Sequence, residues 1–206
     1  PLQVTVLDTG SAPVPGITVT FAVPGSGASA GLSATTCTTN AAGQCPTGIT
    51  ATANGTIGSY AVTASVAGVA TPATFNLTNT AGAPASISVV GGNGQTTPIN
   101  TAFPTALQVV VRDGSNNPVP GRTVTFTPPG SGASAGLSAS SCVTDAIGQC
   151  PTGIVATANG TTGSYAVTAS VAGVAAPATF NLTNTAGAPA SINVVAGNGQ
   201  TTPINT

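Results

Sequence analysis

The sequence predicts an all-β protein made of tandem β-sandwich modules, with no helices of note. Apolar residues alternate with polar ones at 107–111 and again at 123–127, on either side of a turn rich in Asn, Gly and Pro. This is the pattern of strand, turn, strand. Residues 2–101 match residues 107–206 at a constant shift of 105 (107 minus 2). About four in five of the aligned positions are identical, so the two copies share one fold, and short strands within a unit of that length are typical of a sandwich.

The repeat also sets the expected domain boundaries. We expect residues 82–186 to form a complete module, and residues 1–81 to form a module that lacks its first strand. Residues 187–206 then supply the first strand of a following module. We therefore expect the chain to be a window from a longer array, with any export signal or anchor outside it.

The strands of the complete module follow from alternation and turn signals. They are expected at 85–90, 107–111, 123–127, 154–157, 165–171 and 178–183. Between the first two, residues 91–105 are expected to cross irregularly, because Pro98 and Pro104 cannot donate backbone hydrogen bonds to a neighbouring strand.

Two cysteines of each module flank a short turn. Cys142 and Cys150 lie on either side of residues 145–148, which suit a type I turn with Gly148 in the left-handed region. In such a hairpin Thr144 is expected opposite Gly148, and Cys142 then directly faces Cys150. A cross-strand disulfide is geometrically reasonable at that spacing.

The first copy repeats this arrangement with Cys37, Cys45 and the turn glycine Gly43. Closing so short a loop contributes about 2 to 3 kcal/mol on the chain-entropy model and implies an oxidising compartment. Zinc, which needs about four ligands, is the weaker alternative because the chain has no His and one Cys pair per module. Cross-links between chains are a further alternative.

A tyrosine in each copy has a characteristic spacing. Gly163, Tyr165 and Val167 form the pattern Gly-x-Tyr-x-apolar. In immunoglobulin-like sandwiches a Tyr at this place returns its hydroxyl to the backbone as a tyrosine corner. We therefore expect Tyr165, and Tyr60 in the first copy, to be structural.

Several motifs together carry a family resemblance. They are Val109, Val111, Asp113, Pro118, Val119, Gly121, Val124 and Phe126, then 144–148 (TDAIG), 163–167 (GSYAV) and 177–182 (PATFNL). With these motifs the chain resembles the bacterial immunoglobulin-like repeats of group 1, found in invasin- and intimin-type adhesins. The resemblance implies an extracellular Greek-key sandwich of about seven strands, used as a spacer or fibre unit. The cysteine pair and the near absence of charge depart from the family's pattern.

The scarcity of charge excludes several functions. Charged residues make up 2% of the chain, against roughly 25% in ordinary soluble domains. Acid-base catalysis needs a titrating side chain, and His, Glu and Lys are absent, so we expect no enzyme, no catalytic residue and no cofactor. Two Arg residues cannot neutralise enough phosphates for nucleic-acid binding. No apolar run approaches the roughly 18 residues of a membrane-spanning helix.

The acidic residues offer little for a metal. Asp8 and Asp113 each end a strand beside a turn, where we expect the side chain to cap its own turn. Calcium at a module junction is the alternative, but hard-cation sites collect six to eight oxygens. We therefore expect no metal.

Outward strand positions rich in Thr and Ser are candidates for O-linked glycans. Candidate N-glycosylation sites are Asn54, Asn76, Asn159 and Asn181. These modifications require a source with the corresponding machinery.

These observations favour a structural function. We expect a repeat module of an extracellular bacterial surface fibre, such as a filament, a sheath or an adhesin stalk, that acts as spacer and scaffold in adhesion or biofilm. Its partners would be further copies of the repeat, head to tail, with strand donation between modules as one way to join them. The alternative is an adhesin module that binds glycans or a receptor through loops 91–97 and 130–136, although these loops are nearly unchanged between the copies.

Overall fold

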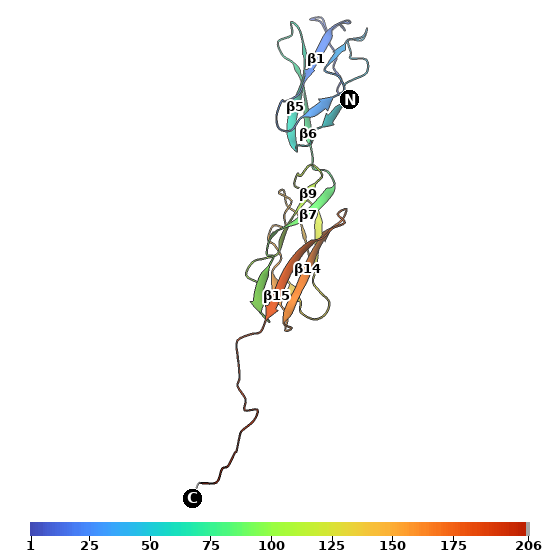
Figure 1. Cartoon of the computed structure of the whole chain (residues 1–206). Coiled ribbons are helices and arrows are strands. Elements are labelled where there is room, and N and C mark those ends of the chain that lie inside the picture. Colours follow the sequence, from blue (N-terminus) through green and yellow to red (C-terminus); the bar gives the residue numbers. More distant parts are fainter. Residues whose placement is uncertain (205–206) are drawn as a thin grey trace.

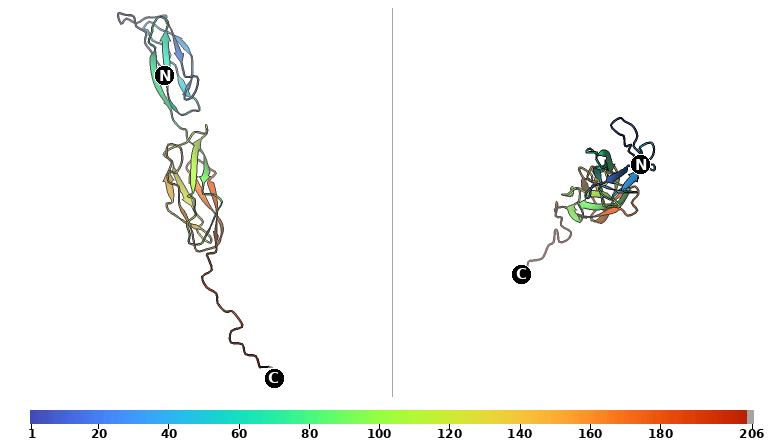
Figure 2. Two further views of the ribbon diagram at one scale, coloured as in Figure 1. Left: turned by 90° about the vertical axis from the view of Figure 1, so that its left-hand side faces the viewer. Right: turned by 90° about the horizontal axis from the view of Figure 1, so that it is seen from above.

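The computed structural model describes residues 1–204, which form two β-sandwich modules and a C-terminal extension (Figure 1). No helix occurs among the described residues, and the predicted all-β fold class is confirmed. Views at right angles show the modules end to end, with the extension leading away from the second (Figure 2). The last two positions of the segment predicted at 187–206 lie outside the described residues.

The first module is built around one antiparallel sheet. Its strands are β1 (Thr18–Ala22), β2 (Ala30–Leu32), β3 (Thr36–Thr38), β4 (Ala51–Ala53), β5 (Gly58–Val66) and β6 (Ala73–Asn79). The sheet has the order β3-β1-β5-β6, and β2 pairs separately with β4.

The second module repeats this plan and adds strands at its start. Its strands are β7 (Pro84–Gly91), β8 (Gln95–Pro98), β9 (Gln108–Asp113), β10 (Thr123–Thr127), β11 (Ala135–Leu137), β12 (Ser141–Val143), β13 (Ala156–Ala158), β14 (Gly163–Val171) and β15 (Ala178–Thr185). One sheet has the order β12-β10-β14-β15-β8. The opposite layer contains the β7–β9 and β11–β13 pairs, connected by bridges from Val110 to Gln149 and from Leu107 to Ile154.

The core lies between the two layers of the second module. Val109 and Val111 of β9 are fully buried against Val124 of β10 and Phe180 of β15. The rings of Phe126 and Phe180 lie 6.1 Å apart between centroids. Alternation along β10 and β15 therefore places one apolar face inside, as the sequence predicts, whereas in β9 Val110 is buried as well.

The predicted irregular crossing at 91–105 is wrong for part of its length. Residues 95–98 form β8, which pairs in parallel with β15 from Leu182–Gln95 to Thr185–Pro98. The strand lies at the edge of its sheet and Pro98 is its last residue. A proline is tolerated there because an edge strand does not need every backbone donor.

Two segments differ from their equivalents in the second module. Residues 3–8 match β9 but make only isolated bridges, including Thr5 with Gln44 and Leu7 with Pro13. Residues 190–195 match β7 but run as chain without a pairing partner (Figure 1). A strand's backbone groups need a neighbour to pair with, and in the second module β7 and β9 provide it for each other.

Candidate inter-module junction and apolar groove

The junction between the modules is fastened by Asp113 at the end of β9. The connector, residues 80–83, donates a hydrogen bond from the Gly82 backbone N–H to Asp113 Oδ2 at 2.9 Å. Asp113 Oδ1 accepts from the backbone N–H groups of Ser115 and Asn117, both at 2.9 Å. One carboxylate therefore caps its own turn and also holds the connector.

These hydrogen bonds favour the ionised form of Asp113. They lower the pKa of the carboxyl from 3.8 to about 2, with the Gly82 N–H as the largest cause and burial acting in the opposite direction. In the first module Asp8 Oδ1 caps the matching turn by accepting from the N–H groups of Gly10 and Ala12.

A second contact crosses the junction directly. Asn117 Nδ2 donates to the backbone oxygen of Gly55, in the first module, at 2.9 Å. The side chain of Ser115 lies against the Gly55 backbone here, since a Cβ added to Gly55 would be 3.3 Å from Ser115 Oγ. The position of Asn117 is occupied by Ala12 in the first copy, which has no amide to offer.

An apolar groove runs along the first module beside residues 4–7. It has a volume of about 250 Å³ and is lined by Val4, Thr5, Val6, Leu7, Val19, Ala64, Val66, Val69, Thr71 and Ala73. In the second module β7 covers the equivalent place. The equivalents of Val4 and Val6, Val109 and Val111, are fully buried there, whereas Val4 and Val6 are half-buried.

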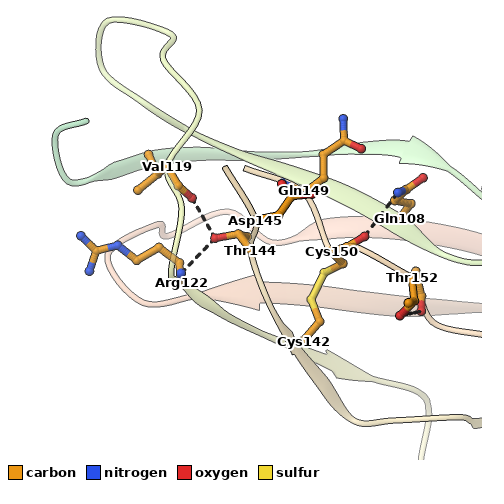
Figure 3. The surroundings of a disulfide bond; sticks show 10 residues. Gln108, Val119, Arg122, Cys142, Thr144, Asp145, Gln149, Cys150 and Thr152 are labelled. Atoms are coloured by element: carbon orange, nitrogen blue, oxygen red, sulfur yellow. Dashed lines mark hydrogen bonds between the residues drawn. A yellow bond between two sulfur atoms is a disulfide. The ribbon is translucent and has the colours of Figure 1, made fainter. Parts of the chain in front are cut away.

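Disulfides join Cys37 to Cys45 and Cys142 to Cys150, each with 5.7 Å between the Cα atoms. Cys142 lies on β12, whereas Cys150 follows Gln149, which bridges to β9 in the opposite layer (Figure 3). Cys150 is fully buried. The disulfide therefore ties the two layers of the sandwich to each other.

The register expected for the cysteine hairpin is wrong by two residues, because Gln149 was expected opposite Val143. The Asp145 N–H donates to the Gln149 oxygen at 2.8 Å, and the Gly148 N–H donates to the Asp145 oxygen at 2.9 Å. Asp145 is thus opposite Gln149, and the expected pairs Thr144–Gly148 and Cys142–Cys150 do not form in the ladder. The reason is that Cys142 pairs instead with Val124 of β10, while Gln149 turns to β9.

The turn glycine and the buried threonine beside it have clear structural tasks. Gly148 has φ 74°, and a Cβ there would lie 2.6 Å from the Val111 oxygen; Gly43 has φ 71° and the same constraint. Thr144 donates to the Val119 oxygen at 2.8 Å and accepts from the Arg122 N–H at 2.9 Å (Figure 3).

Tyr165 binds a side chain where the sequence predicted a backbone partner. Its hydroxyl donates to Asn184 Oδ1 at 3.0 Å. Asn184 is buried, and its Nδ2 donates to the backbone oxygens of Ser134 and Thr161 and to Asn159 Oδ1. Burial raises the pKa of Tyr165. The partner of the hydroxyl is therefore a buried side-chain amide and not the backbone of a tyrosine corner.

The comparisons with known proteins agree with this architecture. Residues 100–183, within the second module, match the family model for the bacterial Ig-like domain (group 1). The second module is therefore similar to bacterial immunoglobulin-like domains of group 1 over residues 100–183. The first module repeats its sequence and its β10–β12, β10–β14 and β14–β15 pairings in the pairs β1–β3, β1–β5 and β5–β6.

Solved structures of other proteins contain similar immunoglobulin-like folds. FdeC, an adhesin of Escherichia coli, is 22% identical with a TM-score of 0.55, over 87% of this chain and 56% of FdeC. InvD of Yersinia pseudotuberculosis is 23% identical with a TM-score of 0.52, over 98% of this chain and 54% of InvD. The chain thus spans just over half the length of these structures. A search of curated proteins finds no match.

The candidate glycosylation sites of the immunoglobulin-like modules differ in their surroundings. The side-chain amides of Asn54 and Asn159 donate to the backbone oxygens of Gly27 and Gly132 and their oxygens accept from nearby N–H groups. Asn76 on β6 and Asn181 on β15 are exposed. A glycan on Asn54 or Asn159 would disturb this network, so Asn76 and Asn181 are the better candidates.

Two groups of functional residues were not anticipated from the sequence. Asn117 joins the modules, and Asn184 with its counterpart Asn79 fastens buried loops. One feature of the sequence indicated the junction. Residues 9–12 of the first copy differ at every position from residues 114–117 of the second, in the turn that meets the preceding module. The buried amides gave no comparable signal.

The two modules contain no candidate metal cluster and no candidate membrane-spanning helix within the described residues. Within residues 1–204 there is no group of three or more His, Cys, Asp or Glu side chains that could hold a metal ion. None of the described segments is a helix long and apolar enough to cross a membrane. Loop 91–97 is tied to its own module, because Gln95 Nε2 donates to the backbone oxygens of Gly92 and Thr105 and Gln95 Oε1 accepts from the Thr105 N–H.

Proposed function

We propose that the chain is a structural repeat unit of an extracellular bacterial surface fibre, such as a filament, a sheath or an adhesin stalk. Its modules act as spacers and scaffold in adhesion or biofilm, with further copies of the repeat as partners, head to tail. The observation that carries this proposal is the junction, where Asp113 and Asn117 hold the connector and the preceding module. Such a fastening keeps successive modules in line.

The disulfides, the fold and the low net charge support the same function. The layers are tied by disulfides, which persist in oxidising compartments such as the cell exterior. FdeC, which shares the fold, is an adhesin. A net charge of -1 favours association over dispersal as monomers. We infer that the protein is located outside the cell or on its surface and is not an enzyme.

A binding function for the loops is the less favoured alternative. Loop 130–136 is held by Ser134, which donates to the Pro129 oxygen and to Asn159 Oδ1. Loop 91–97 is fastened by Gln95 in a similar way. Both loops therefore stabilise their own module, which fits a scaffold better than a receptor site.

Electron microscopy of material from the native source tests the proposal, with antibodies against this chain to mark the structures. The longest strands have 9 residues and span about 30 Å at roughly 3.3 Å per residue, so with the loops at both ends we expect a module length of about 35 to 40 Å. We expect labelled threads with this axial spacing, or twice it. Labelled rods that end in a distinct head would assign the chain to an adhesin stalk, and label confined to the cell interior would refute the proposal.

A further inference from the structure

We propose that the pairing of β8 with β15 makes the second module resist a pull along the fibre axis, because such a pull loads the two strands in shear. The inference rests on the proposed function and deepens it, since a spacer in a surface fibre transmits tension from one neighbour to the next. Resistance to a pull depends on the rate at which the module unfolds under force. The structural question is therefore which hydrogen bonds must break first.

Force would enter and leave the second module at opposite ends of the sandwich. The connector, residues 80–83, joins this module to the first one, and the chain leaves at the far end after β15 (Figure 1). From the connector the chain continues into β7, which pairs with β9, and then into β8, which pairs with β15. The β8–β15 pair therefore directly links the entering segment to the departing one.

The direction of β8 determines how this pair is loaded. β8 runs parallel to β15, in register from Leu182–Gln95 to Thr185–Pro98. A pull on the start of β8 and on the end of β15 therefore acts along the two strands in opposite directions. Because the hydrogen bonds run between the strands, they share this load and must break together. A pair that is pulled apart at one end would instead open one bond after another.

Further hydrogen bonds extend the pair beyond both ends of β8. On one side, Asn93 Oδ1 accepts from the Asn181 N–H at 2.7 Å, and the Gly94 N–H donates to the Asn181 oxygen at 2.9 Å. On the other side, the Ile99 N–H donates to the Thr185 oxygen at 2.9 Å. The bonds that share the load therefore continue past the strand pair itself.

Both strands are also fastened to the rest of the module. β15 pairs with β14 from Gly163–Asn184 to Ala169–Ala178, and the Asn184 side chain donates to the Ser134 oxygen. Gln95 of β8 is held by its hydrogen bonds with the Thr105 backbone. Neither strand can therefore slide along the other without breaking hydrogen bonds on a second side.

Single-molecule force spectroscopy of the full chain tests the inference by changing the direction of the pull. Thr162→Cys places an attachment point at an exposed position just before β14. A pull between this point and the C-terminal end separates the start of β14 from the end of β15. That pair begins at Gly163–Asn184, so its hydrogen bonds would open one after another.

The same variant pulled from its two chain ends is the reference, because its folded state and its stability are identical. In this arrangement both modules unfold, and the second is recognised by its longer step, since it contains more residues. We expect its rupture force to be several-fold higher from end to end than from position 162 to the C-terminal end. Equal rupture forces in the two directions would overturn the inference.

A substitution in β8 assigns the resistance to this strand. The Gly94 N–H faces β15, and alternate residues of a strand donate to the same neighbour, so the Thr96 N–H faces β15 too. Thr96→Pro removes this donor at a position whose side chain is exposed. Thr96→Ala is the matched control, because it removes the same side chain and keeps the N–H group.

We expect T96P to lower the end-to-end rupture force of the second module and T96A to leave it unchanged. Equal rupture forces for T96P and T96A would overturn the assignment to β8. If T96P does not fold, the comparison of the two pulling directions in the Thr162→Cys variant still decides the inference, because that variant keeps every strand of the module.

These outcomes are separable from the proposed function. Labelled native threads, together with a rupture force that does not depend on direction, would refute the shear-loaded pair and leave the fibre proposal standing. A direction-dependent rupture force in a protein found only inside the cell would refute the fibre proposal and leave the shear-loaded pair standing.

Discussion

Asn184 shows how a nearly uncharged chain stabilises its interior. Its amide donates to two backbone oxygens and to Asn159, and its oxygen accepts the hydroxyl of Tyr165. No buried side-chain nitrogen or oxygen in residues 1–204 lacks a partner. An unsatisfied buried polar group costs about 1 to 3 kcal/mol. The buried amides and hydroxyls therefore favour the loop conformations in which all of their hydrogen bonds form.

Removing the Tyr165 hydroxyl should destabilise the second module. In Tyr165→Phe the buried Asn184 oxygen loses its donor, so we expect a loss of about 0.5 to 1.5 kcal/mol in the free energy of unfolding, measured by urea denaturation. Tyr60→Phe is the matched control, because no hydrogen bond of the Tyr60 hydroxyl is found among the described residues. Equal losses in the two variants would contradict this role of the hydroxyl.

Asp113 should make stability depend on acid pH. Its pKa is lowered from 3.8 to about 2 in the folded chain, so the folded state favours the carboxylate. The resulting stabilisation is fully present above pH 3.8 and disappears as the pH falls through about 2. The midpoint temperature of thermal unfolding of the wild type should therefore decrease as the pH is lowered from about 4 to 2.

Asp113→Asn isolates this contribution. The variant should be less stable than the wild type at pH 6, because a neutral amide accepts the Gly82 and Ser115 N–H groups less strongly. The difference between the two midpoints should shrink as the pH is lowered to 2. A difference that stays constant with pH would show that the ionised carboxylate has no special role at the junction.

At the scale of elements, the disulfide is the covalent tie between layers. Cys142 belongs to β12, and Cys150 lies beside the bridge to β9. Cys142→Ser with Cys150→Ser should lower the free energy of unfolding of the second module by about 2 to 3 kcal/mol, on the loop-closure model. Chemical denaturation followed by Tyr165 fluorescence, in a Tyr60→Phe background, measures it. An equal denaturation midpoint in the variant and its background would contradict a stabilising role, and so would a background midpoint that reductant does not change.

The sequence was sufficient to predict the elements that depend on local pattern. Alternation located β10 at its observed bounds, and the expected strand at 85–90 lies within β7. The predicted register of the cysteine hairpin was wrong because each arm of the hairpin pairs with a different strand. Cys142 pairs with β10, and Gln149 bridges to β9. β8 was missed because its partner, β15, lies more than 80 residues away in the chain.

The candidate sites divide in the same way. The turn glycine Gly148 was predictable, since its positive φ is a local property of the turn. Asn117 was not, because its partner Gly55 lies 62 residues away and belongs to the other module. Asn184 contacts Ser134 across 50 residues. Such contacts become visible only when the layers are placed against each other.

At the scale of the whole molecule, the junction determines how straight an array can be. A short connector by itself permits many orientations, and inter-domain motion is the ordinary expectation where the interface is small. Here the Gly82–Asp113 bond holds the connector, and the Asn117–Gly55 bond fixes the turn of one module against the loop of the other. The Asn117–Gly55 bond restrains bending, because it joins parts of the two modules that are distant from the connector. The Gly82–Asp113 bond does not join such parts.

Asn117→Ala should therefore increase bending without unfolding either module. It removes the side-chain bond to Gly55 and the bonds that the same amide donates to Asp113, and it reproduces the alanine that the first copy carries at position 12. Small-angle X-ray scattering should show a shorter maximum dimension and a broader distribution of distances for the variant, while the unfolding midpoint at pH 7 changes by no more than a few degrees. Ser115→Ala is the control, since it keeps the backbone cap on Asp113 and removes only a hydroxyl beside Gly55. If scattering from N117A and the wild type were superimposable, the connector and Asp113 would suffice to align the modules, and a junction with alanine at this position would be as straight as the one within the chain.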